Sequence, residues 1–289
     1  MLEVEGVSKT YSGGVAALQD IALTVEKGVF GLLGANGAGK STLMRTLATL
    51  QEPDQGEIRL DGRDLLSDPQ VARRRIGYLP QDMGVYPRVT AFEMLDFLAG
   101  LKGLKRKERR RQVADLLEQV NLVAVADRRL DTYSGGMRRR FGIAAAFLGA
   151  PELVIVDEPT AGLDPSERRR FQLLLAEASQ DCILILSSHI VEDLAGLCNN
   201  LALMKEGRIV ASGAPSTLVD ALSGKIWHKN VSFNELPRFQ NEYNTLSWRP
   251  QDGSLTVRVF SEQPPGDAFE PAVADLEDLY AAHVTQTIQ

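Results

Sequence analysis

The sequence of 289 residues is poor in cysteine and contains no long apolar run. Its two cysteines, Cys182 and Cys198, argue against a disulfide framework and suit a reducing compartment. No stretch approaches the ~18 to 20 apolar residues that cross a bilayer, and residues 1–5 lack the basic and then apolar pattern of a secretory signal. These absences predict a protein that stays in the cytoplasm.

Positive charge is also scarce, because the formal net charge is −6 and the pI is about 5.3. This balance argues against a broad nucleic-acid-binding surface. Local basic clusters occur at residues 73–75, 105–111, 138–140 and 168–170. No aromatic residues are interleaved with them to stack on bases. We therefore interpret most of them as solvated helix faces and predict no nucleic-acid partner.

A glycine-rich loop follows an apolar segment, residues 29–33, that is typical of a buried strand. The loop fits G-x-x-x-x-G-K-[ST], and helical spacing follows it, as this phosphate-binding motif requires. Its N–H groups can point at one anion, and the helix start adds its positive dipole end. We expect Lys40 to reach the β- and γ-phosphates and Ser41 to ligate Mg²⁺. The predicted nucleotide-binding residues here are Gly34, Ala35, Asn36, Gly37, Ala38, Gly39, Lys40, Ser41 and Thr42.

An acid pair, Asp157 and Glu158, ends a second apolar segment at residues 153–156. Asp157 at the strand tip can hold Mg²⁺, directly or through water. Glu158 points elsewhere, which makes it the candidate general base for an attacking water. Two acids can simply end a strand, but the complete phosphate loop upstream favours the functional interpretation.

A second glycine pair, Gly135 and Gly136, follows Ser134 and precedes a basic helical stretch. One nucleotide does not need two phosphate-holding loops on one subunit, so each loop is expected to serve a different nucleotide in a site shared by two copies. With these residues assembled, the first 220 or so residues resemble the nucleotide-binding subunit of ATP-binding cassette (ABC) transporters. The LSGGQ signature of that family is matched with Tyr133 in place of Leu and Met137 in place of Gln.

The resemblance implies further site residues. Gln81 resembles the Q-loop glutamine, and His189 resembles the switch histidine that touches the γ-phosphate. Asp164 resembles the D-loop aspartate at the dimer interface, while Tyr11 resembles the aromatic residue that stacks on adenine, although a tyrosine beside a strand is often plain packing. The predicted catalytic residues are thus Glu158, His189, Gln81 and Lys40, the predicted metal ligands are Ser41, Gln81 and Asp157, and Ser134, Gly135, Gly136, Asp164 and Tyr11 complete the nucleotide contacts.

The order of apolar segments predicts an α/β fold with a mainly parallel sheet and a helical subdomain, followed by a small C-terminal α+β module. The resemblance implies that the core is a P-loop NTPase and that the first strands form an antiparallel β layer. The predicted divisions are residues 1–222 for the ATP-binding domain, about 82–145 for its helical subdomain and 225–289 for the accessory module. The accessory module resembles the C-terminal segment of drug, antibiotic and glycan exporters.

The resemblance predicts an ATPase that binds ATP and Mg²⁺ and dimerises around two ATP molecules, as a homodimer or with a related cassette. It would power export of an unknown substrate through membrane-embedded permease subunits on separate chains, at the inner face of the cell membrane. Export is inferred from residues 78–81, residues 86–88 and the C-terminal tail. The alternatives are a soluble ABC-fold ATPase that works on DNA or ribosomes and a nucleotide-gated regulatory module without transport. The intact Glu158 and His189 argue against a module without turnover.

Overall fold

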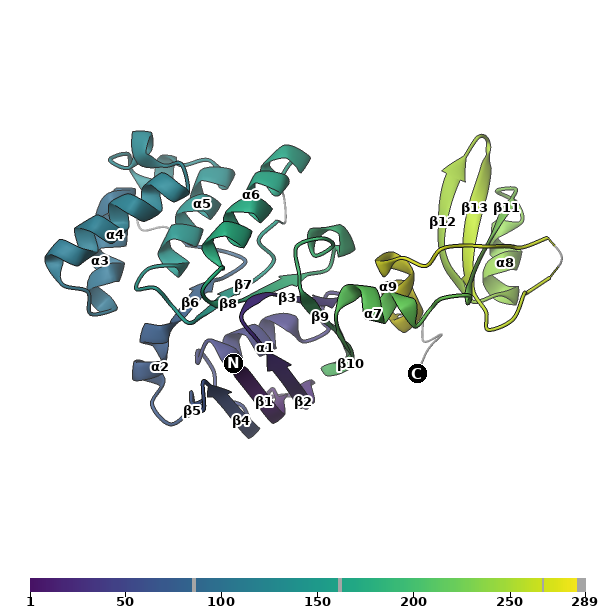
Figure 1. Ribbon diagram of the computed structural model, residues 1–289, viewed down its shortest axis with the longest axis horizontal. Coiled ribbons are helices and arrows are strands. Elements are labelled where there is room, and N and C mark those ends of the chain that lie inside the picture. The colour runs from purple at the N-terminus through teal and green to yellow at the C-terminus, as the bar shows by residue number, and fades with distance from the viewer. Residues whose placement is uncertain (85–86, 161–162, 267, 285–289) are drawn as a thin grey trace.

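A central sheet divides the protein into layers, with the strand order β10 (Arg208–Gly213), β9 (Asn200–Lys205), β3 (Gly28–Gly34), β8 (Ile183–Ser188), β7 (Leu153–Val156) and β6 (Ile76–Leu79). The computed structural model describes residues 1–84, 87–160, 163–266 and 268–284 (Figure 1). All neighbouring pairs run parallel except the β9–β10 hairpin. Successive side chains of a strand point to opposite faces, so Leu33 joins one core and Leu32 the other.

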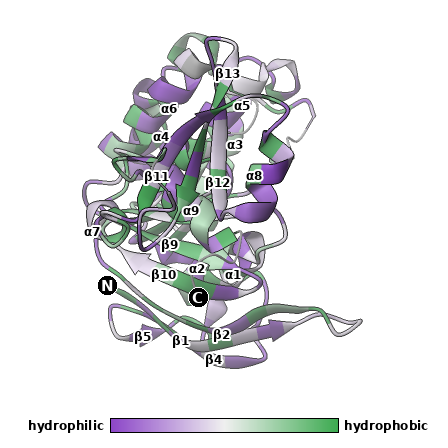
Figure 2. Cartoon of the chain, turned by 90° about the vertical axis from the view of Figure 1, so that its right-hand side faces the viewer, coloured by the Kyte–Doolittle hydropathy of each residue, from purple (hydrophilic) through white to green (hydrophobic). Residues whose placement is uncertain are grey.

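An antiparallel layer covers one face of the central sheet and consists of β2 (Ala16–Val25), β1 (Leu2–Thr10), β4 (Gln55–Leu60) and β5 (Arg63–Asp64). Figure 2 shows this layer beneath the rest of the molecule. Helix α1 (Lys40–Leu47) buries Leu43 and Leu47 in the same core as Leu2 and Val4 of β1. The short helix α2 (Pro69–Arg75) leads into β6. This core therefore fixes the position of α1, whose first turn follows the phosphate loop.

Helices cover the other face of the central sheet: α3 (Ala91–Leu101), α4 (Arg106–Gln119), α5 (Gly135–Ala146) and α6 (Pro165–Ala178), with the 3-10 turns η1 (Val123–Val125), η2 (Leu130–Thr132) and η3 (Val191–Asp193). Thr90 and Glu93 form a reciprocal capping box at the start of α3, which satisfies two otherwise unpaired N–H groups. Leu95, Leu117 and Phe141 pack in one core with Val154 of β7.

The C-terminal part forms a third, antiparallel sheet after helix α7 (Pro215–Asp220), with β11 (Ile226–Val231), β12 (Thr245–Gln251), β13 (Ser254–Phe260) and β14 (Glu270–Pro271), helix α8 (Leu236–Glu242) and helix α9 (Leu276–Val284). Figure 1 shows it at one end of the molecule, with α7 and α9 between it and the central sheet. Helix α9 packs against β9 and η3, and the Lys205 ammonium donates 2.6 Å to the His283 carbonyl.

The predicted architecture of a mainly parallel core, an antiparallel layer, a helical subdomain and a C-terminal α+β part matches the structure. The numerical divisions at 82–145, 222 and 225–289 stay predictions. Residues 85–86, 267 and 285–289 of those ranges lie outside the described residues, and so does residue 86 of the segment used to infer export.

Candidate functional site

The phosphate loop adopts a backbone that only glycine takes without strain at two positions. Gly37 has φ +83° and Gly39, which precedes α1, has φ +104°. A Cβ atom at Gly39 would lie 2.4 Å from the carbonyl oxygen of Ala17. The loop is therefore held against β2, with its backbone curled around the start of α1 as a phosphate cradle requires.

Lys40 is folded over this loop and is only 4% exposed. Its Nζ donates 2.7 Å to the Gly34 carbonyl and 3.1 Å to the Ala35 carbonyl, and it lies 3.6 Å from Oε1 of Glu158. Burial lowers the pKa of the Lys40 ammonium, and the Glu158 carboxylate opposes that shift. The two hydrogen bonds to carbonyl oxygens hold the Lys40 ammonium at the phosphate loop.

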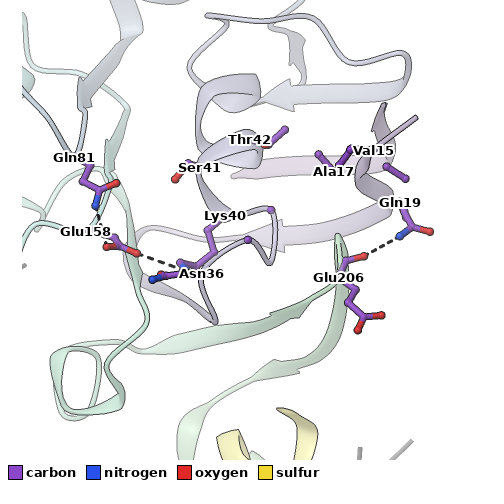
Figure 3. Close-up of a pocket in the computed structure, with 13 residues that line it drawn as sticks. Val15, Ala17, Gln19, Asn36, Lys40, Ser41, Thr42, Gln81, Glu158 and Glu206 are labelled. Atoms are coloured by element: carbon purple, nitrogen blue, oxygen red, sulfur yellow. Dashed lines mark hydrogen bonds and ion pairs between the residues drawn. The ribbon is translucent and has the colours of Figure 1, made fainter. Parts of the chain in front are cut away.

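A cleft of about 660 Å³ opens beside the loop, and Figure 3 shows its residues. The loop side carries Asn36, Lys40 and Ser41, and the far side carries Gln81 and Glu158. Its remaining wall comes from two distant segments and was not predicted: Val15, Ala16, Ala17, Gln19 and Glu206.

This wall is assembled by contacts that no local sequence pattern signals. The Gln19 side chain donates 2.8 Å to the Glu206 carbonyl, and the Gln19 N–H donates 2.8 Å to the Gly207 carbonyl. They tie β2 to the β9–β10 turn. The wall therefore depends on a pairing of residues 187 positions apart in the chain.

Asp157 is 3% exposed and is held by Ser187, a residue that the sequence analysis did not single out. The Ser187 hydroxyl donates 2.5 Å to Oδ1 of Asp157 and accepts the Glu158 N–H at 2.9 Å. Ser41 and Gln81 line the cleft, whereas Asp157 borders a neighbouring cavity together with Gln81. Their hydroxyl, carboxylate and amide oxygens are of the hard type that Mg²⁺ prefers, and the role of these three residues as metal ligands stays a prediction. Among the described residues, no three His, Cys, Asp or Glu side chains cluster in a way that could hold a metal ion.

Glu158 contacts each of the other three predicted catalytic residues. Its Oε1 lies 3.2 Å from Nδ1 of His189 and its Oε2 accepts a 3.3 Å hydrogen bond from Gln81. Although the His189 contact is short, its geometry is not that of a hydrogen bond, and Nδ1 of His189 is buried without such a partner. Glu158 has φ +46°, which is strained for a residue with a side chain. The structure thus brings Lys40, Gln81, Glu158 and His189 together.

The signature segment lies near Gln81 and Glu158 but outside the phosphate-loop cleft. Ser134 caps α5, with its hydroxyl accepting the Met137 N–H at 3.2 Å, and Gly135 is exposed. None of residues 133–137, all of which are described, lines the phosphate-loop cleft. Gly135 instead borders a separate cavity of about 300 Å³ with Gln81 and Glu158, and no residue of the phosphate loop lines that cavity. The signature glycines therefore do not meet the loop of their own chain.

Tyr11 and Asp164 are engaged in local contacts. The Tyr11 hydroxyl donates 2.9 Å to Gln51 and lies 3.4 Å from Oγ1 of Thr42, and the residue does not line the cleft. Asp164 caps α6 by accepting the N–H groups of Ser166 and Glu167, both at 2.8 Å. Its pKa is lowered, chiefly by the Glu167 N–H. The adenine and dimer-interface roles of these residues stay predictions.

Sequence comparison agrees with this geometry. The family model described as ABC transporter matches residues 18–161. The linearmycin resistance ATP-binding protein LnrL of Bacillus subtilis is 35% identical over 226 residues, which cover 78% of this chain and 72% of that protein. The chain belongs to the ABC transporter family. The predicted ABC family and its ATP-binding, ATP-hydrolysing type of subunit are thereby confirmed.

Two further similar proteins differ in how much of their own length this chain covers. The ABC transporter A family member 8 of Dictyostelium discoideum is 38% identical over 217 residues, which cover 73% of this chain but only 26% of that protein. A solved ATP-binding subunit of an ABC transporter superposes with a TM-score of 0.70 at 30% identity, covering 76% of this chain and 92% of its own. The chain is thus similar to one part of larger ABC proteins and to nearly the whole of a separate ATP-binding subunit.

Proposed function

We propose that this chain hydrolyses ATP as one of a pair of cassettes, in two sites that each combine the phosphate loop of one copy with the signature glycines of the other. The observation that carries the proposal is the separation of Gly135 from the phosphate-loop cleft of its own chain. A two-fold pair uses the same surface on both copies, so one contact creates both sites. The exposed N-terminus of α5 then supplies N–H groups and a positive dipole end to the partner's nucleotide.

The cleft residues suit in-line attack of water on the γ-phosphorus. Glu158 accepts the proton of the attacking water while the bond from the γ-phosphorus to the bridging oxygen breaks, giving ADP and inorganic phosphate. Gln81 orients the water, and Lys40 and His189 stabilise the charge that builds on the γ-phosphate oxygens. Ser41, Asp157 and Gln81 would hold Mg²⁺, which neutralises phosphate charge when bound.

We further propose that the paired cassettes drive export through membrane permease subunits on separate chains, at the inner face of the membrane. A relative named as a Nod factor export ATP-binding protein and the relative named for linearmycin resistance support this function. In the described part of the chain, no helix is long and apolar enough to cross a membrane. The α3 side chains of Phe97 and Leu101 are 58% and 66% exposed, and such apolar exposure on the helical subdomain suits a docked partner.

Complementation between two inactive variants tests the shared site. Glu158→Gln removes the base but keeps the signature segment, while Gly135→Asp keeps the base and places a carboxylate where phosphate would bind. A Cβ atom at Gly135 would meet nothing within 4 Å, so the second variant should fold normally. An equal mixture should recover about a quarter of the wild-type ATPase rate, because half of the pairs are mixed and each mixed pair has one complete site of two.

Two outcomes of this experiment would contradict the proposal. A Gly135→Asp protein with wild-type turnover would show that the signature does not contact the reacting nucleotide. A mixture as inactive as its two components would show that each chain completes its own site. Mixing Glu158→Gln with wild-type protein provides the matched control for subunit exchange.

A further inference from the structure

A buried carboxylate close to the site has no role in the scheme above. Asp193 ends η3, four residues after His189, and is 3% exposed. Thr160 and Ser188, which contact it, are 4% and 3% exposed. A charge this deeply buried is costly unless its oxygens are paired, so its presence calls for a physical reason.

One oxygen of Asp193 joins the two segments that carry the catalytic groups. Its Oδ2 accepts a 2.5 Å hydrogen bond from Oγ1 of Thr160 and a 3.0 Å hydrogen bond from Oγ of Ser188. Thr160 follows Glu158 by two residues, and Ser188 immediately precedes His189. The carboxylate therefore bridges the segment after the proposed base to the segment before the switch histidine.

The other side of Asp193 is anchored to helix α6. Gln172 donates 3.0 Å to the Asp193 carbonyl, and Nε of Arg168 lies 3.3 Å from Oδ1. That ion pair lacks hydrogen-bond geometry, because both Nε of Arg168 and Oδ1 of Asp193 are buried without a hydrogen-bond partner. The Asp193 carboxylate is therefore hydrogen-bonded by Thr160 and Ser188 but not by Arg168.

We propose that Asp193 is a positioning residue that holds Glu158 and His189 in register for hydrolysis. The inference rests on the roles proposed for those two residues. By taking both hydroxyl donors on one oxygen, the carboxylate fixes the separation of the two segments and so maintains the 3.2 Å approach of Glu158 to His189. Asp193 does not line the cleft and acts only through its neighbours.

The first test is Asp193→Asn, which keeps the shape of the side chain. If the amide oxygen accepts the two hydroxyls, its NH₂ group faces the Arg168 cation, so one contact is lost in either orientation. Since small misplacement of reacting groups costs up to ~10²-fold in rate, we expect kcat to fall about 10- to 100-fold while KM for ATP changes less than about 2-fold.

The matched control is Asp278→Asn in α9. Asp278 is 1% exposed and accepts a 2.8 Å hydrogen bond from Arg258, so it is an equally buried, ion-paired carboxylate outside the site. Both variants should melt at lower temperature than the wild type, but only Asp193→Asn should lose turnover. Equal kcat in the two variants at a temperature where both are folded would overturn the proposal.

The second test is a double-mutant cycle with His189→Ala. If Asp193 acts through His189, adding Asp193→Asn to His189→Ala should lower kcat by less than about 2-fold further. If the two losses multiply, the positioning role through His189 is wrong. Failure of the proposed function would appear differently, as retained turnover in Glu158→Gln, which is measured on a separate variant.

Discussion

Oε1 of Glu158 lies 3.2 Å from Nδ1 of His189, although the two residues are 31 positions apart in the chain. The contact follows from the sheet. Strands β7 and β8 are parallel neighbours with Val156 paired to Leu186, so the residues beyond their carboxyl ends emerge at the same edge. Strand order thus brings together the proposed general base and the histidine proposed to contact the γ-phosphate.

Replacing Glu158 with Gln should abolish most turnover and leave nucleotide binding intact. Loss of a general base costs ~10² to 10⁴ in rate, whereas Lys40 and the loop N–H groups, which are proposed to bind phosphate, are unchanged. Single-turnover ATP hydrolysis and binding of a fluorescent ATP analogue measure the two effects. Lys40→Ala provides the contrast, because it should weaken binding itself. A Glu158→Gln enzyme with kcat within about 3-fold of wild type would refute the assignment of the base.

The two left-handed glycines of the phosphate loop should differ in their tolerance of alanine. Both substitutions impose about 1–2 kcal/mol of backbone strain. At Gly37 a Cβ atom meets nothing within 4 Å, whereas at Gly39 it meets the Ala17 carbonyl oxygen at 2.4 Å. Gly39→Ala should therefore be the more destabilised protein in urea unfolding and should lose ATP affinity. Equal unfolding free energies for the two variants would contradict the close approach of the loop to β2.

Lys102, at the end of α3, should make stability depend on alkaline pH. Burial lowers its pKa from 10.5 to about 8, and its Nζ donates 2.9 Å to the Ile76 carbonyl. Between these values the unfolded chain binds more protons than the folded one, so folding becomes more favourable as pH rises from about 8 to 10.5. The gain is about 3 kcal/mol at most.

The variant Lys102→Met should therefore be more stable than the wild type at pH 7, where a buried charge is removed. Its advantage should shrink as the pH rises through the pKa of Lys102, because the wild type then folds with a neutral amine. Urea unfolding of both proteins across this pH range measures the difference. A difference that does not vary with pH would show that Lys102 titrates normally.

Much of the site was predictable because its signals are local. The strand, glycine loop and Lys40 are consecutive, and Asp157 directly follows an apolar strand. In the C-terminal part, the consecutive residues Asp252 and Gly253 are typical of a tight hairpin turn, and both adopt the positive φ that such a turn requires. Local turn chemistry and apolar alternation were sufficient in these places.

The features that the sequence did not predict depend on contacts between segments that are far apart in the chain. Ser187 holds Asp157 only because β8 lies beside β7, and no motif announces that order. Glu206 reaches the cleft through its pairing with Gln19. Strand β11 carries the polar residues His228, Lys229 and Asn230 in succession, so no alternation of apolar and polar residues marks it as a strand. Such features follow from sheet topology, which a single sequence specifies only through its global packing.

Helix α9 packs back against the main core, which limits where the chain can be shortened. Leu276 and Tyr280 pack against the core that contains Val191 and Leu194, close to the bridge formed by Asp193. A chain that ended before α9 would therefore expose apolar core residues next to η3, the turn that follows His189. Because α9 contacts both β12 and η3, this helix links the C-terminal sheet physically to the segment that follows His189.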